Sequence, residues 1–124
     1  MATTTTVTLL STTTFGTAAG NYDGSSTSFS SDKSKGDGYY GFADGVHTIQ
    51  SRVTNFVGTL KIQATLATTP VEADWATITT VITSDGSTAV TNGYLTTFTG
   101  NYVWVRVNVS EFTAGSINNV LLGH

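Results

Sequence analysis

Hydrophobic and polar residues alternate with a period of two in several stretches of the chain, and no stretch of twelve or more residues shows a helical period. Residues 56–66 give the clearest example, because every second residue is apolar or small and the residues between them are mostly polar. The first set is Phe56, Gly58, Leu60, Ile62, Ala64 and Leu66. This pattern predicts an antiparallel strand with one buried and one solvent-facing side.

The same reasoning predicts seven further strands, over residues 5–10, 39–42, 46–53, 75–83, 89–98, 102–109 and 116–122. The strand over 75–83 has apolar residues on both faces, so we expect it to lie inside the sheet. The strand over 102–109 has a face made only of valines, at positions 103, 105, 107 and 109. We expect this valine row to face the core.

Residues with turn chemistry separate the predicted strands. Asp85-Gly86 indicates a hairpin, and Asn92-Gly93 predicts a turn or a bulge. Gly100-Asn101 and Ala114-Gly115 are expected to separate the last strands. Thr69-Pro70, with Glu72 two residues on, predicts the start of a one-turn helix.

These elements predict an all-β protein, a single-domain antiparallel β-sandwich that is jelly-roll-like, over residues 1–124. A small closed barrel is the alternative. Residues 20–38 are rich in Ser, Gly, Asp and Lys, with Tyr22 and Phe29 as the few apolar anchors. We expect this segment to be a flexible loop or arm.

The composition of the chain argues against several classes of function. The net charge is −3, only 10% of residues are charged, and five Lys and Arg are too few for a nucleic-acid-binding stripe. The chain has no cysteine, which excludes disulfides and thiolate metal sites. We see no secretory signal and no apolar run long enough to span a bilayer, so we expect synthesis in a cytoplasm and no membrane partner.

We expect no catalytic residue, cofactor or metal. His47 is the one internal histidine, and the sequence has no Gly-x-Ser-x-Gly motif that would supply a nucleophile, so a histidine bonded to backbone is the favoured interpretation. Asp23, Asp32, Asp37 and Asp44 lack calcium-loop spacing and are typical of turns. Glu72, Asp74 and Glu111 give no sign of a glycosidase pair.

The candidate interaction residues are Tyr102, Trp104, Arg106 and Asn108, which alternate with the valines, together with Trp75. An aromatic and arginine row is typical of an interface hot spot, and a sugar platform uses similar residues. The third interpretation is that the row is covered by the N-terminal arm or another strand and belongs to the core.

Two segments carry a resemblance that covers roughly the last seventy residues. Residues 56–66 read FVGTLKIQATL and lead to Asp74-Trp75, while residues 100–107 read GNYVWVRV and lead to GSINNVLL at 115–122. This order resembles small β-sandwich virion proteins of tailed bacteriophages. It is also similar to galactose-binding-like (discoidin) jelly rolls, although the Ser-Gly segment stands where those domains carry their ligand loops.

The resemblance implies a non-enzymatic virion structural protein, either a capsid decoration (cement) subunit or a tail or neck accessory subunit. Its expected location is the virion, and its expected partners are copies of itself and other virion proteins. The alternative is a carbohydrate-binding or receptor-binding module of a phage appendage, with a glycan as partner. An enzyme such as a glycan hydrolase is the minor third possibility, because no acid–base set is recognisable.

Overall fold

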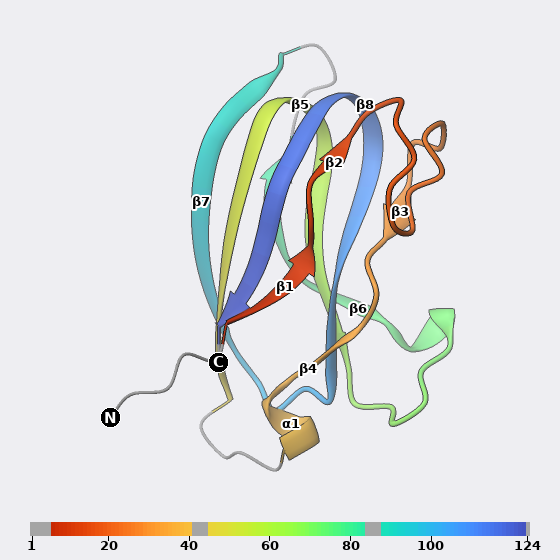
Figure 1. The fold of residues 1–124 in the computed structure, drawn as a ribbon. Helices are drawn as coiled ribbons and strands as arrows, with labels where there is room; N and C mark the ends of the chain where they lie inside the picture. The colour runs from red at the N-terminus through yellow and green to blue at the C-terminus, as the bar shows by residue number, and fades with distance from the viewer. Residues whose placement is uncertain (1–5, 41–44, 84–87, 124) are drawn as a thin grey trace.

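The computed structural model describes residues 6–40, 45–83 and 88–123, and it confirms the all-β class and the antiparallel, jelly-roll-like β-sandwich (Figure 1). The strands are β1 (Thr6–Leu10), β2 (Thr13–Thr14), β3 (Phe29–Ser30), β4 (Ser34–Lys35), β5 (Val46–Thr65), β6 (Ala76–Thr83), β7 (Val90–Thr99) and β8 (Trp104–Gly123). The short helical elements are α1 (Asp37–Tyr40) and η1 (Glu72–Asp74). The order β1-β8-β5-β6 leaves β1 and β6 at opposite ends, so the described strands do not close into a barrel.

The two 20-residue strands β5 and β8 run through both layers of the sandwich. They pair with each other from Thr48↔Gly123 to Thr65↔Trp104 and curve together over the core (Figure 1). The first layer contains β7, residues 46–54 of β5, the end of β8, β1 and β2. The second layer contains β6, residues 59–65 of β5, the start of β8, β3 and β4.

Both long strands bend where the backbone takes positive φ angles. Asn55 in β5 has φ of 50°, and Glu111 and Gly115 in β8 have φ of 54° and 86°. Asparagine and glycine tolerate this left-handed region, and glutamate tolerates it less well. The bends pack closely, because a Cβ on Gly115 would overlap the carbonyl group of Asn55. The tight backbone approach at Gly115 therefore helps to fix how the two layers fold over each other.

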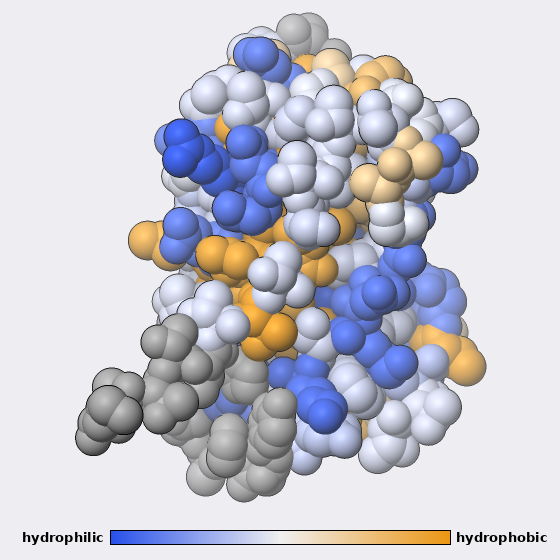
Figure 2. All heavy atoms as spheres, in the orientation of Figure 1, coloured by the Kyte–Doolittle hydropathy of each residue, from blue (hydrophilic) through white to orange (hydrophobic). Residues whose placement is uncertain are grey.

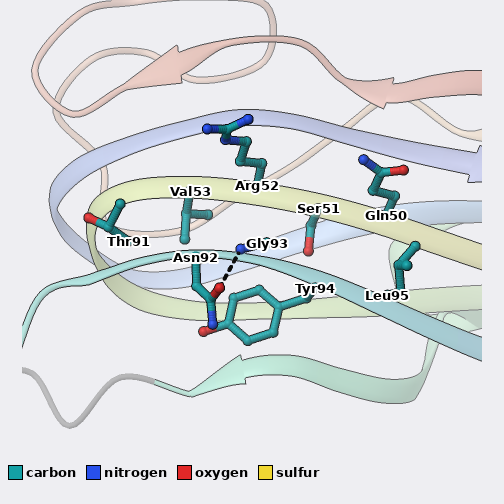
Figure 3. Close-up of a pocket in the computed structure, with 9 residues that line it drawn as sticks. All are labelled: Gln50, Ser51, Arg52, Val53, Thr91, Asn92, Gly93, Tyr94 and Leu95. Carbon is teal, nitrogen blue, oxygen red and sulfur yellow. Dashed lines mark hydrogen bonds between the residues drawn. The ribbon is translucent and has the colours of Figure 1, made fainter.

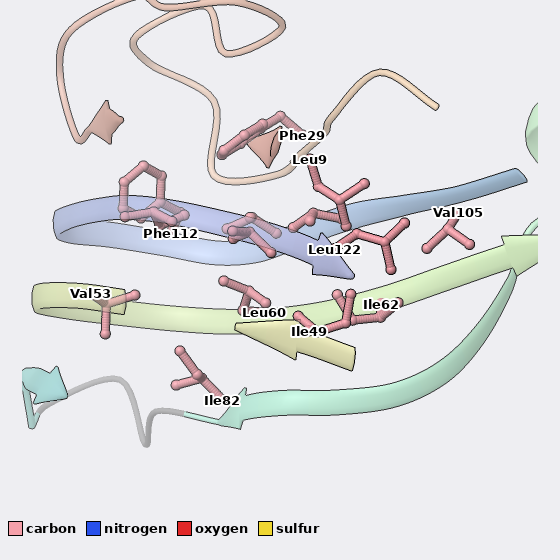
Figure 4. Close-up of a cluster of buried hydrophobic side chains, with 14 of the residues drawn as sticks. Leu9, Phe29, Ile49, Val53, Leu60, Ile62, Ile82, Val105, Phe112 and Leu122 are labelled. Atoms are coloured by element: carbon pink, nitrogen blue, oxygen red, sulfur yellow. The ribbon is translucent and has the colours of Figure 1, made fainter. Parts of the chain in front are cut away.

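The core lies between the layers and has three of the four valines of the predicted row at its centre, whereas Val103 precedes β8 and is half-buried. Val105, Val107 and Val109 have no exposed surface, which confirms their expected orientation. Facing residues from both long strands complete the core (Figure 4). They include Ile49, Val53, Leu60, Ile62, Ala64, Ile117, Val120 and Leu122. Burying each of these larger aliphatic side chains stabilises the fold by about 1.5–3 kcal/mol.

A cluster of aromatic rings closes one end of the core around Phe112. Its ring centroid lies 5.3 Å from that of Tyr22 and 5.6 Å from that of Phe56, and Tyr22 also contacts Phe29 at 5.0 Å. Tyr22 and Phe29 belong to the Ser-Gly-rich segment 20–38, so these two anchors hold part of that segment against β8.

Several predicted boundaries are wrong. The predicted strands 46–53 and 56–66 are one strand, β5, and those over 102–109 and 116–122 are one strand, β8. The bends keep pairing across 54–57 and 111–115, where the sequence predicted breaks. The strand predicted over 39–42 is also wrong, because α1 occupies Asp37–Tyr40. Residues 41–44, and the hairpin predicted at Asp85-Gly86, lie outside the described residues.

Other local predictions also need correction. The strand predicted over 75–83 is β6, which pairs only with β5 and therefore lies at an edge rather than inside the sheet. Leu66 is 69% exposed, because β5 ends one residue before it. Asn92-Gly93 stays within β7 and does not turn the chain, although the register between β5 and β7 shifts beside Asn92, between the pairs Val53↔Asn92 and Phe56↔Val90. The helical turn begins at Glu72, after Val71, rather than at Pro70.

Candidate functional site

The outer face of the second layer brings most of the predicted interaction residues together. Trp104, Arg106 and Asn108 alternate with the buried valines and therefore point away from the core. On the neighbouring strand, Gln63 lies opposite Arg106 and Lys61 lies opposite Asn108. We refer to this surface, together with the loop residues that contact it, as the outer face.

Arg106 is the most heavily bonded residue of the outer face. Its Nε donates to Oε1 of Gln63 at 2.8 Å, and Nη1 and Nη2 donate to the two carboxylate oxygens of Glu72 at 3.1 and 2.6 Å. The guanidinium carbon also lies 4.4 Å from the ring centroid of Trp75. The Arg106 side chain is only 8% exposed, whereas that of Glu72 is 81% exposed. The loop carrying η1 therefore covers Arg106 and neutralises its charge.

The Arg106 hydrogen bonds, followed by its positive charge, hold the pKa of Glu72 below its ordinary value, while partial desolvation opposes them. A carboxyl group with a lowered folded-state pKa contributes stability above its unfolded pKa and loses that contribution as pH falls through the folded value. We therefore expect Glu72→Gln to lower the unfolding free energy at pH 7 by about 1 kcal/mol or less, since Glu72 is exposed.

The difference in stability between the unmodified protein and Glu72→Gln should shrink as pH falls through the lowered pKa of Glu72, because the carboxylate then becomes protonated. Urea denaturation at pH 7 and at pH 3 measures it. Glu111→Gln is the matched control, because the Glu111 side chain is exposed and makes no hydrogen bond or ion pair within the described part of the chain. An equal loss of stability at both pH values would show that the ion pair is not responsible.

Trp104 lies in a second group of rings and cations on the outer face. Its Nε1 donates to the carbonyl oxygen of Thr68 at 3.1 Å, and its ring lies 5.1 Å from that of Tyr39. The Nζ of Lys33 is 5.0 Å from the Trp104 centroid, and the Nζ of Lys35 is 4.6 Å from the Tyr39 centroid. These cation–π contacts attach the segment around β4 to the start of β8.

Asn108 and Tyr102 have different surroundings from their neighbours in the predicted row. Asn108 donates to Oγ of Ser30, so the segment carrying β3 partly covers it. Tyr102 precedes β8, and its ring lies 6.0 Å from that of Phe98 at the border of the core. The structure therefore places Trp104, Arg106, Asn108 and Trp75 on the outer face, and it places Tyr102 apart from them.

The outer face is also where the basic residues gather. Four of the five Lys and Arg residues of the chain are there, namely Lys33, Lys35, Lys61 and Arg106. The sequence alone does not assign Lys33, Lys35, Tyr39 or Glu72 to this surface. The spacing of Lys33 and Lys35, two residues apart, was the available signal for a shared side. Their strand partner could not be inferred, because it is about seventy residues away in the sequence.

His47 has the backbone-bonded role that was favoured for it. Its Nε2 accepts the N–H of Asp37 at 3.1 Å, which leaves the proton on Nδ1, and Nδ1 donates to the carbonyl oxygen of Gly45 at 2.9 Å. The ring is fully buried and stacks on Phe98 with centroids 5.0 Å apart. A substrate would have no access to this imidazole in the described arrangement.

The acidic residues are used in separate local contacts. The Asp23 carboxylate accepts bonds from the hydroxyl of Ser26 and the backbone N–H groups of Ser25 and Ser26, which lower its pKa to about 2. Asp74 accepts the N–H of Val71. Within residues 6–40, 45–83 and 88–123, no group of three or more potential ligands could hold a metal ion. Asp44 lies outside the described residues.

The edges of the two layers differ sharply between the two sides of the sandwich. On one side, β6 and β7 are eight and ten residues long, and neither contains a charged residue or proline. On the other side, β1–β4 are two to five residues long, β1 has a register shift, and β4 carries Lys35. Short, irregular and charged strands protect an edge against pairing with another chain, whereas long uncharged strands favour such pairing.

No protein-family model matches the chain, and no curated protein matches it. None of the described helices is long and apolar enough to cross a membrane.

Proposed function

We propose that this protein is a non-enzymatic structural subunit of a tailed-bacteriophage particle, either a capsid decoration subunit or a tail or neck accessory subunit. It acts through contacts with copies of itself and with other virion proteins, and its location is the virion after synthesis in the host cytoplasm. The observation that carries the proposal is the pair of long, uncharged edge strands β6 and β7 on one side of the sandwich.

Edge strands favour assembly because their outward N–H and C=O groups are hydrogen-bonding partners for another strand. A stable interface buries about 1,600 Å² in total, and one edge with its neighbouring side chains supplies part of that area. An apolar area also lies over β1 and β8, bordered by weakly polar and by strongly hydrophilic side chains (Figure 2). Low charge limits repulsion between copies that meet there.

Other features support a role without catalysis. His47 is buried with both ring nitrogens bonded to backbone, Glu72 is paired with Arg106, and Asp74 caps a turn. General acid–base chemistry needs such groups to face a substrate. The virion assignment itself rests on the resemblance of residues 56–75 and 100–122 to small phage virion proteins.

Glycan binding by a phage appendage is the alternative function. The aromatic residues of the outer face, Trp104, Tyr39 and Trp75, are partly exposed or exposed and lie beside polar groups. However, Lys33 lies over the Trp104 ring and Arg106 lies over the Trp75 ring. A sugar would need to displace these cations before it could stack, so we favour the assembly function.

The oligomeric state tests the proposed function. We expect light scattering coupled to size exclusion to show a dimer or larger homo-oligomer at concentrations of tens of micromolar, because strand pairing supplies the contact. A glycan array probed with the same sample tests the alternative. A monomer at every accessible concentration, or specific glycan binding by a monomer, would count against the assembly function.

A further inference from the structure

On the outward edge of β7, an exposed leucine side chain lies beside a hollow in the surface. Leu95 is 72% exposed on the outer side of the first layer, and Gly93, two residues earlier, points to the same side without a side chain. Around Gly93 lies a shallow hollow of about 520 Å³, whose rim includes Arg52, Gln50 and Thr91 (Figure 3). An added Cβ at Gly93 would meet nothing closer than 3.9 Å, so this space is open.

The hydrogen bonds show which backbone groups face the open edge. The N–H of Gly93 donates to the side-chain oxygen of Asn92 at 2.8 Å (dashed in Figure 3). The N–H of Gly93 is thus satisfied by its neighbour on β7, on the side away from β5. Because successive residues in an antiparallel strand direct N–H and C=O to opposite sides, the same groups of Leu95 also face outward.

We propose that two copies of this chain join β7 to β7 in antiparallel orientation, around a two-fold axis at Tyr94. This inference rests on the proposed function and specifies the contact through which copies assemble. In this register Leu95 of each copy lies opposite Gly93 of the other and fills its hollow. Gly93 and Leu95 then exchange backbone hydrogen bonds across the axis, and the Asn92 side chain releases the N–H of Gly93.

The register follows from three features of β7. It pairs every residue from 90 to 98 with a residue of the other copy, so that nearly the whole strand is used. It places Thr91 opposite Thr97 and Tyr94 opposite its own copy, and both Thr–Thr and aromatic pairs stabilise antiparallel strands. It also keeps the outer sides of both first layers on one side of a continuous sheet, because a two-fold axis perpendicular to the sheet preserves its faces.

A second copy fits this edge because the strand is complementary to itself. Leu95 and the hollow at Gly93 lie two residues apart on the same strand, each one residue from Tyr94. The strand carries no charge that would oppose a copy of itself, and the nearest cation on the rim, Arg52, can pack its aliphatic stem against the incoming leucine.

Charge placed on β7 tests the surface. We expect Leu95→Lys to weaken self-association by about tenfold or more, because an ammonium group would have to enter the hollow. Thr80→Lys on the other edge strand, β6, is the matched control and should self-associate like the unmodified protein. Sedimentation equilibrium measures both, and circular dichroism checks that each variant folds. If Thr80→Lys dissociates the oligomer and Leu95→Lys does not, this inference fails while the proposed assembly function stands.

Cross-linking tests the register, and the chain has no cysteine to interfere. Residues directly opposite in antiparallel strands have Cα atoms about 4.5–5.5 Å apart, within the range that a disulfide spans. Tyr94→Cys should therefore form a disulfide-linked dimer under mild oxidation. Thr91→Cys and Thr97→Cys should each remain unlinked alone and form a mixed dimer when combined. Cross-linking of Thr97→Cys alone, or none in any sample, would overturn the register, and a monomeric unmodified protein would overturn the proposed function as well.

Discussion

Gly115→Ala is expected to destabilise the protein by about 3–5 kcal/mol, enough to remove much of the stability of a domain of this size. Gly115 has φ of 86°, where a side chain costs roughly 1–2 kcal/mol. The larger part of the effect comes from contact, because the new Cβ would overlap the backbone of Asn55 in the other bend. Relief would require β5 and β8 to move apart at the point where both change layers.

Gly16→Ala provides the control for this substitution. Gly16 has nearly the same φ, 88°, but a Cβ there meets no atom within 4 Å. We expect it to cost only the conformational part, about 1 kcal/mol. Urea denaturation of the two variants separates strain from overlap. Equal losses in both would mean that the close approach of the bends is unimportant.

Phe112→Ala is expected to cost about 3–5 kcal/mol, because it removes a fully buried ring that contacts four other aromatic rings. Two of these rings, Tyr22 and Phe29, anchor the Ser-Gly-rich segment. In the variant, the backbone amides of this segment should therefore exchange with solvent faster than the backbone amides of β5. Hydrogen exchange followed residue by residue measures this difference.

Phe15→Ala is the comparison for Phe112→Ala. Phe15 also contacts Phe112, with its ring centroid 5.6 Å away, but it is 40% exposed. We expect a loss of about 1 kcal/mol and little change in exchange of residues 22–29. If both phenylalanine variants lose the same stability, the cluster does not depend on Phe112 as its centre.

The sequence predicted the parts of the fold that depend on local alternation. The valine row at 105, 107 and 109, and the apolar row at 60, 62 and 64, are buried as expected, because side chains two residues apart in a strand share a face. The sequence does not predict the continuity of β5 and β8, because a bend inside one strand and a turn between two strands have the same local signals. The sequence predicts that Ala114-Gly115 separates two strands, whereas in the structure Gly115 lets β8 continue around a bend.

The candidate site was predictable only along one strand. Trp104, Arg106 and Asn108 share a face because of their spacing, and this was evident in the sequence. Their partners come from loops distant in the chain, as Glu72 and Lys33 do, and no periodicity links them. Tyr102 does not lie on the outer face with these residues, because β8 begins two residues after it. The edge position of β6 depends on topology, which alternation does not encode.

The shared strands have a consequence for how the chain folds. Pairs such as Thr48↔Gly123 join residues that are far apart in the sequence, and the β5–β8 pairing connects both layers in this way. Proteins dominated by such distant pairings fold slowly, because the entropy cost of closing a long loop comes before the favourable contacts form. During translation the core cannot form until the residues of β8 have left the ribosome. Until then β5, with which β6 and β7 pair, lacks its other neighbour β8. Synthesis is therefore the stage at which this chain is most exposed to mispairing.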